Sequence, residues 1–174
     1  MKKLTLLMAG ILSISSINAT AADFLQLGLI SPVQLSPVEN DIIGLRLNIY
    51  GVNQNVTGLD LGIVNDTEGD FKGLSTGIVE FVRGDSKGIH LYWLPGFGMV
   101  EGDMSGLQLN GWYFNVKGTM TGIQFAFVTK AAQAKGLQVG LVNIAEDMYG
   151  LQVGVVNIIR ANKVPFLPIV NARF

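Results

Sequence analysis

The sequence predicts an all-β fold. Three features of the chain point to it: a short glycine-led repeat, an alternation of polar and apolar residues within the repeat, and charged residues concentrated between the repeats. We expect an antiparallel up-and-down β-barrel of about 8–10 short repeated strands. The alternative is a parallel β-solenoid, in which each repeat forms one coil of the chain.

The repeat is an octad that opens with glycine. Its eight copies begin at Gly44, Gly58, Gly73, Gly88, Gly106, Gly122, Gly136 and Gly150. The spacings between these glycines are 14, 15, 15, 18, 16, 14 and 14 residues. The clearest copies are Gly-Leu-Gln-Val-Gly-Leu-Val-Asn at 136–143 and Gly-Leu-Gln-Val-Gly-Val-Val-Asn at 150–157. Such self-similarity is typical of a chain built from one repeated structural unit.

Polar and apolar positions alternate within the octad. The second position is always Leu or Ile, and the fourth and sixth are mostly large and apolar. The third position is always polar, with Arg46, Asp60, Ser75, His90, Gln108, Gln124, Gln138 and Gln152. The fifth is Gly in four copies. A period of two predicts a β-strand with unlike faces, whereas a helix would need apolar residues three and four apart.

Charged residues lie mainly in the connectors between octads. Only Arg46, Asp60 and Glu80 fall within the 64 octad positions, whereas 14 charged residues lie in the 50 connecting positions. Because connectors of about six residues suit hairpins, we expect consecutive octads to pair antiparallel. Residues 24–30 and 166–174 predict one further strand at each end, and residues 31–40, with two prolines, form a linker.

Two observations bear on the choice between the barrel and the solenoid, and they favour opposite architectures. Identical residues at identical positions, such as the four successive glutamines, would stack as ladders in a solenoid. The spacing drifts from 14 to 18 residues, which favours the barrel because a coil accepts insertions only as bulges. For a barrel we expect the apolar positions to face outward to lipid and Gly and Gln to face inward, since about 24 large side chains would overfill a small barrel. The inner face should then leave no room for a side chain at Gly140 or Gly154. In a soluble solenoid with a core of Leu and Val, the apolar positions would instead face inward and Gln138 would lie at the surface.

The first 21 residues predict export. Lys2 and Lys3 precede an apolar run over 4–17, and Ala19 and Ala21 supply the small residues of a signal-peptidase site. The run is shorter than the roughly 20 residues that span a bilayer. We therefore expect residues 1–21 to be a cleaved secretory signal peptide and residues 22–174 to form a single repeat-built β domain.

Composition excludes several function classes. The chain has no Cys and one His, so we expect no metal site and no cofactor. Without Lys2 and Lys3 it has 10 basic and 13 acidic residues, which argues against a nucleic acid partner. Arg46, Asp60 and His90 share the polar face. We expect an Arg46–Asp60 ion pair and a hydrogen-bonded interior His90 rather than catalysis, because no Ser lies in a nucleophile turn nearby, and we expect no enzymatic activity.

Aromatic residues concentrate in three adjacent repeats. They are Tyr92, Trp93, Phe97, Trp112, Tyr113, Phe114, Phe125 and Phe127. One interpretation is an interfacial belt or a platform for lipid or glycan, with Trp93, Phe97, Trp112 and Tyr113 as candidate ligand or interface residues. The other is that the aromatics fill the interior where the octad is imperfect. The chain also ends in Phe174 on an alternating strand, as many outer-membrane barrels do.

The octads, followed by the Pro-rich segment 164–174, resemble those of the bacterial surface-repeat proteins, exported envelope proteins of unknown function. The resemblance covers about residues 44–174 and is weakest over 88–116. It implies a shallow, radially repeated β-barrel, called a β-flower, without catalytic residues.

These observations together predict where the protein acts and in what role. We expect a non-enzymatic envelope protein with a structural or interaction role, at or in the outer membrane or in the periplasm of a Gram-negative-type bacterium. Its expected partner is membrane lipid or an envelope component. The alternative is a periplasmic binding module for a lipid or another apolar ligand.

Overall fold

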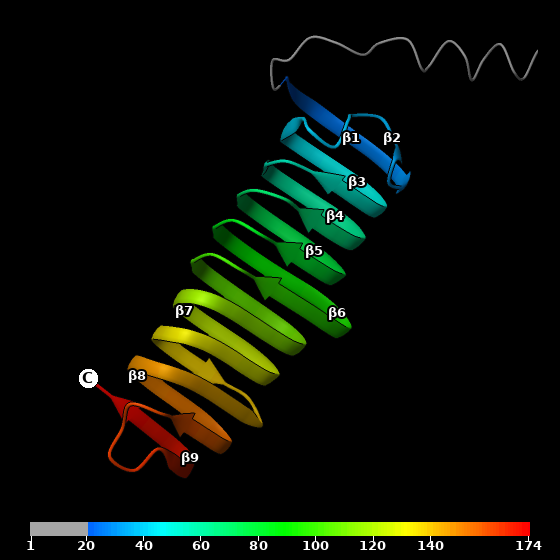
Figure 1. Cartoon of the computed structure of the whole chain (residues 1–174). Coiled ribbons are helices and arrows are strands. Elements are labelled where there is room, and N and C mark those ends of the chain that lie inside the picture. The colour runs from blue at the N-terminus through cyan, green and yellow to red at the C-terminus, as the bar shows by residue number, and fades with distance from the viewer. Residues whose placement is uncertain (1–20) are drawn as a thin grey trace, which may run out of the picture.

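The computed structural model describes residues 21–174, and the predicted signal peptide, apart from Ala21, lies outside the described residues. The described chain forms nine strands: β1 (Ala22–Ile30), β2 (Val33–Gln34), β3 (Asp41–Asn53), β4 (Val56–Thr67), β5 (Phe71–Val82), β6 (Ser86–Val100), β7 (Met104–Val139), β8 (Val142–Ile159) and β9 (Phe166–Arg173). They make one sheet in the order β2-β1-β3-β4-β5-β6-β7-β8-β9. Figure 1 shows them stacked from β1 at one end to β9 at the other.

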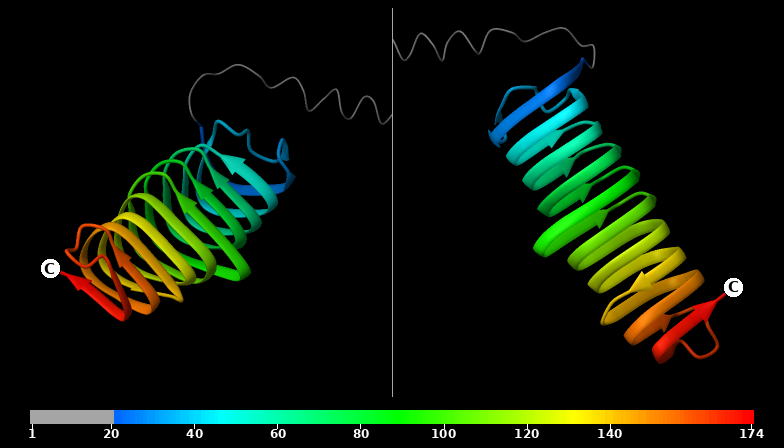
Figure 2. Two further views of the ribbon diagram at one scale, coloured as in Figure 1. Left: turned by 60° about the horizontal axis from the view of Figure 1, so that its bottom comes forward. Right: turned by 180° about the vertical axis from the view of Figure 1, so that it is seen from behind.

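The all-β class is confirmed, and the architecture is the alternative one, a parallel β-solenoid. From β1 through β8, with β2 excepted, each strand pairs in parallel with the next one along the chain. Successive coils therefore run as loops around a common interior (Figure 2). The expected antiparallel barrel is wrong, as is the radially repeated barrel that the resemblance implied. Antiparallel pairing occurs only where β2 meets β1 and β9 meets β8 among the described strands.

The connectors explain why the octads do not form hairpins. Each connector is itself strand that stacks on the connector of the next coil, as Ile42 on Val56 and Val56 on Phe71. A corner of two or three residues, such as 54–55 or 68–70, divides its extended parts. The chain thus completes a full turn between octads, and each octad arrives beside the preceding one in the same direction.

The variable spacing is absorbed at two kinds of place. Corner 54–55 has two residues and corner 68–70 has three, which accounts for the change from 14 to 15. The longest coil contains a bulge: the offset between β5 and β6 is 15 residues at Gly77 and Tyr92 and 18 at Val79 and Phe97. The chain therefore accommodates its extra residues partly as a bulge, although the need for bulges was the argument against a solenoid.

The octad face directions are those expected of the lipid-facing barrel and not those expected of a soluble solenoid: polar residues lie inside and apolar residues outside. All eight third-position residues are buried, including Arg46, Asp60 and His90. Gln138 is fully buried, whereas its neighbour Val139 is partly exposed. Consecutive strand residues point to opposite faces, so the second, fourth and sixth positions line the outside of the solenoid.

The apolar core lies on the connector side of the coils. Its buried members are Ile42, Val56, Phe71, Val82, Val100, Met104, Val116, Met120, Ala131, Ala134, Ala145, Met148 and Ile159. Most of them come two residues before an octad or directly before a corner. The interior therefore has an apolar half beneath the connectors and a polar half beneath the octads.

Glycine at the first octad position is required by the backbone. All eight of these glycines have φ between 125° and 151°. A Cβ on Gly136 would lie 2.2 Å from the carbonyl oxygen of Gly122 in the coil before. No L side chain fits that combination of conformation and close approach, so the repeat must open with Gly.

The flanking segments follow the predicted pattern. β1 and β9 correspond to the expected end strands, and Leu27 of β1 pairs with Leu47 of the first octad. Segment 31–40, predicted as a linker, contains the short strand β2 and folds back against the first coil. There Ser36 N–H donates to Gln26 Oε1, and Asn53 Nδ2 donates to the carbonyl of Pro37. These bonds give the segment a place on the solenoid.

Candidate functional site: an apolar outer face over a polar interior

The octad side of the solenoid presents an outer face of apolar side chains. We use "outer face" for the outward octad positions and their continuation in β1 and β9. Leu25 extends the second-position row at one end, and Val170 extends the fourth-position row at the other. The three charged octad residues are all buried inside. The outer face therefore carries no charged side chain over the eight octads.

Many large side chains of this face are exposed to a third or more of their surface. Examples in the octads are Ile49, Ile63, Leu74, Ile89, Leu91, Trp93, Leu94, Ile123, Phe125, Phe127, Leu141 and Val155. Soluble proteins seldom expose a contiguous apolar surface of this extent unless it contacts a partner or a membrane. The outer face is the strongest candidate for a functional surface in the described part of the chain.

The polar residues beneath the outer face satisfy one another in ladders. Gln124 Nε2 donates to Gln108 Oε1 at 2.8 Å, Gln138 repeats this contact on Gln124 at 2.8 Å, and Gln152 repeats it on Gln138 at 2.9 Å. Each buried amide thus finds a partner one coil away, which removes most of the cost of its burial.

The predicted Arg46–Asp60 ion pair is confirmed. Arg46 Nε and Nη2 donate to the two carboxylate oxygens of Asp60 at 2.8 and 2.6 Å, and both side chains are fully buried. Arg46 also donates to the carbonyl of Asp66 and to Thr67 Oγ1. Burial raises the pKa of the Asp60 carboxyl above its ordinary 3.8, although Arg46 opposes this. The pair holds adjacent coils together in a dry interior.

His90 is an interior hydrogen-bonded residue, as predicted, and its partners include residues that the sequence did not indicate. Its Nδ1 lies 2.9 Å from Glu80 Oε2, and its Nε2 lies 2.8 Å from Ser86 Oγ. Tyr92 donates its hydroxyl to the same Glu80 oxygen at 2.9 Å. Burial and the Glu80 carboxylate raise the pKa of the Tyr92 phenol well above 10.0.

The Ser86–His90–Glu80 array has the atom order of a serine hydrolase triad. No substrate carbonyl reaches Ser86, however, because its side chain is 2% exposed and His90 and Glu80 are as deeply buried. The ring of Phe71 packs against His90 with centroids 4.9 Å apart. We therefore interpret the array as a buried polar network of the interior, in which Glu80 Oε1 has no hydrogen-bond partner among residues 21–174.

The aromatic residues divide between the two faces. Tyr92 and Phe114 lie inside with ring centroids 4.7 Å apart, so the interior-filling interpretation holds for them. Trp93, Phe97 and Trp112 are exposed. The sequence pattern alone could not separate the groups, because the octad is irregular where the bulge occurs.

The four candidate interface aromatics do not form one cluster. Phe97 on β6 and Tyr113 on β7 are register partners on neighbouring coils. Trp112 packs against Phe127 with centroids 4.9 Å apart, and Trp93 lies in the bulge of β6. All four belong to the central coils, so they border the outer face midway along the solenoid.

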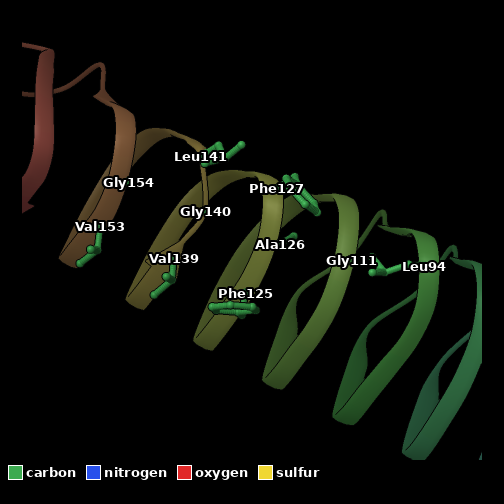
Figure 3. A pocket seen from close by; sticks show the side chains of 10 residues that line it. All are labelled: Leu94, Gly111, Phe125, Ala126, Phe127, Val139, Gly140, Leu141, Val153 and Gly154. Carbon is green, nitrogen blue, oxygen red and sulfur yellow. The ribbon is translucent and has the colours of Figure 1, made fainter.

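A groove of about 430 Å³ runs along the outer face over β7 and β8. Small residues lie along its middle: Gly111, Ala126, Gly140 and Gly154. Large apolar side chains stand in rows on both sides: Phe125, Val139 and Val153 on one, and Leu94, Phe127 and Leu141 on the other (Figure 3). The floor of the groove between the two rows is the backbone at or near the fifth position, where side chains would point inward. The sequence pattern showed these small residues but not that they align.

Further chemistry is limited in the described residues. No group of three or more His, Cys, Asp or Glu side chains in residues 21–174 is arranged to hold a metal ion. The same residues contain no helix long and apolar enough to cross a membrane.

No protein family, curated protein or solved structure matches the chain.

Proposed function

We propose that this protein is an exported, non-enzymatic component of the bacterial envelope that attaches to the lipid of a membrane through its outer face. The observation that carries the proposal is the inverted octad: uncharged apolar side chains point outward while Arg46, Asp60, His90 and the glutamines are buried. The predicted signal peptide and the resemblance to surface-repeat proteins support a place at the outer membrane or in the periplasm.

The inverted octad is costly in water. A shift of one residue would exchange the two faces of every octad and bury the Leu, Ile and Val side chains. Burial of apolar surface stabilises by about 25 cal/mol per Å², so an octad that exposes this surface forgoes a large term in water. Lipid against the outer face restores that term, and the ladders satisfy the polar side.

The distribution of charge supports the same orientation. Exposed charged residues such as Glu68, Arg83, Glu101 and Glu146 lie at the corners on the connector side. Trp93 and Trp112 are exposed beside the outer face, and tryptophan favours the boundary between lipid and water. A solenoid lying on a membrane by its outer face would leave its corners in water.

Flotation with vesicles of phosphatidylethanolamine and phosphatidylglycerol tests the proposal. The mature chain should float with the vesicles, and the Ile49→Glu/Ile63→Glu variant should float several-fold less. The control is Gln54→Glu/Gln133→Glu, which adds the same charge at corners on the connector side and should float like the parent. A parent chain that stays at the bottom of the gradient, or a face variant that floats unchanged, would overturn the proposal.

The groove favours a second candidate, a periplasmic binding module for a lipid or another apolar ligand. Native mass spectrometry of protein purified without detergent distinguishes the two. A soluble monomer that carries a ligand and does not float would support the binding module.

The absence of enzymatic activity is also a proposal, and loss of a hydrolase activity in a folded His90→Ala variant would contradict it.

A further inference from the structure

The groove on the outer face lies in a part of the chain without acidic residues. Residues 104–145 contain three lysines and no Asp or Glu, whereas residues 54–103 contain eight acidic residues and three basic ones. The groove is lined mainly from this acid-free segment. This segment is therefore positive, in contrast to the coils before it, and the next acidic residues are Glu146 and Asp147 at the following corner.

Two of the lysines lie on the coils of the groove, outside its lining. Lys130 follows Phe127 by three residues on β7 and points outward, because its neighbours Thr129 and Ala131 are both buried. Lys135 precedes Val139 by four residues and is exposed on the other side, where it lines a second pocket with Asp147 and Arg173. Within the described residues neither forms an ion pair, whereas Lys117 is held by Glu101 at 2.6 Å.

The shape of the groove selects a linear apolar chain. Its lining residues come from five successive coils, and strands lie about 4.8 Å apart, so it extends for roughly 19 Å. A helix, about 10 Å across, is too wide for the single row of small residues. A peptide strand would find no partners, because the backbone beneath is already paired between coils, as at Val139 and Val153.

We infer that this groove binds the acyl chain of a single-chain anionic lipid, whose head group is attracted by the positive charge of Lys130 and Lys135. The inference rests on the proposed attachment of the outer face to lipid, and it names the class of lipid that the groove binds. The chain lies lengthwise over Gly140 between the two apolar rows. The negative head group is attracted to the acid-free coils and repelled from the coils before them.

Titration of the mature chain with palmitate in buffer without detergent tests the inference, with hexadecanol as the uncharged ligand of the same length. One palmitate should bind per chain, more tightly than hexadecanol. Leu141→Glu places a carboxylate in the groove and should weaken palmitate binding by at least about tenfold. Its matched control is Gln54→Glu, which adds the same charge at a corner on the connector side and should bind palmitate like the parent.

A second pair of variants tests the head group. Lys130→Gln/Lys135→Gln should weaken palmitate binding several-fold and leave hexadecanol binding unchanged, whereas Lys72→Gln/Lys87→Gln should change neither. Equal binding by the Leu141→Glu and Gln54→Glu variants, or no preference for palmitate over hexadecanol, would overturn the inference. If the chain floats with vesicles but fails these tests, only the groove assignment falls. If it binds one palmitate and does not float, only the membrane attachment falls.

Discussion

At the scale of single residues, Gly154 tests how closely the coils approach. A Cβ at this position would lie 1.9 Å from the carbonyl oxygen of Gly140 and 2.6 Å from Asn143 Nδ2. We expect Gly154→Val to lower the free energy of unfolding by more than about 1 kcal/mol, despite the better strand propensity of valine. Urea denaturation measures the change.

The neighbouring position supplies the control. Val155 is 63% exposed on the outer face, so Val155→Thr should change the free energy of unfolding by no more than about 0.5 kcal/mol. A neutral or stabilising Gly154→Val would show that the inner face has room, contrary to the close approach of the backbones.

Glu80 should make stability depend on pH. Burial raises the pKa of its carboxyl, but His90 and the hydrogen bonds from His90 and Tyr92 lower it more, so the pKa lies below the ordinary 4.5. A lowered pKa stabilises the fold above the unfolded-state value, and this contribution disappears as pH falls through the folded-state value. We expect the free energy of unfolding to fall more steeply between about pH 5 and pH 3 in the parent than in Glu80→Gln.

Comparing the parent with Glu80→Gln also cancels the contribution of Asp60, which has the opposite pH dependence. The pKa of Asp60 is raised, so Asp60 contributes stability at low pH that is lost as pH rises. Asp60 is present in both proteins, and the difference between their urea denaturation profiles therefore reports on Glu80. Parallel profiles would show that Glu80 does not favour its ionised form in the fold.

Sequence reasoning at this scale found the residues that share an octad position and missed those that do not. Arg46, Asp60 and His90 all occupy the third position, so their common interior was predictable. Ser86 precedes its octad by two residues, and Glu80 is the eighth residue of the octad before. Only parallel stacking brings both to His90, so an analysis based on hairpins could not pair them.

At the scale of the coil, the corners tolerate a change of length and the octads should not. The two-residue corner 146–147 occupies the place that Glu-Gly-Asp fills at 68–70 and again at 101–103. Insertion of Gly between Glu146 and Asp147 recreates that three-residue corner. We expect it to lower the free energy of unfolding by less than about 1 kcal/mol in urea denaturation.

An insertion within the octad is the contrasting case. One Gly between Gln138 and Val139 exchanges the faces of the residues that follow, so apolar side chains turn inward and polar ones outward. The C-terminal coils should then fail to stack, with a loss of β-sheet circular dichroism. Similar stability of the two insertion variants would contradict the separate roles of corner and octad.

The direction of strand pairing was not predictable from the octads, because an octad looks the same whether its neighbour is parallel or antiparallel. The informative signal lay in the connectors. Apolar residues recur two positions before the octads, as at Ile42, Val56, Phe71 and Met104. In a hairpin loop at the surface such residues would be exposed to water. These residues form the apolar core, and such a row predicts that the connector is also part of a coil.

At the scale of the whole molecule, the solenoid separates two surfaces along its length. The outer face is continuous because every coil from β1 to β9 contributes the same positions to it. The alternation predicted that each octad has one apolar and one polar face. It did not predict which face points outward, because the apolar face of a soluble solenoid would be expected inside. The groove was not predictable, because it depends on the alignment of Gly111, Ala126, Gly140 and Gly154 across coils.

The ladder of identical contacts has a consequence for how the chain finds its place while folding. Gln108, Gln124, Gln138 and Gln152 make the same bond at each step, so translation by one whole repeat leaves these contacts unchanged. Arg46 and Asp60 break this symmetry, because their ion pair forms only when these two coils are stacked in the native register. If the coil of Asp60 were skipped, Arg46 would meet Ser75 and lose its counter-charge.

Replacing both residues of this ion pair should therefore make mis-stacking of coils during folding more frequent, with little change in the free energy of unfolding of the native state. Arg46→Gln/Asp60→Gln extends the glutamine ladder, and replacing both partners of a buried pair is often nearly neutral, whereas Asp60→Gln alone should cost about 3–5 kcal/mol. Cysteines at Leu47 and Thr76 lie two coils apart, roughly 10 Å, and become neighbours only when a repeat is skipped. Refolding under oxidising conditions should cross-link them more often in the double variant than in the parent, and equal yields would mean that the ends of the solenoid alone set its register.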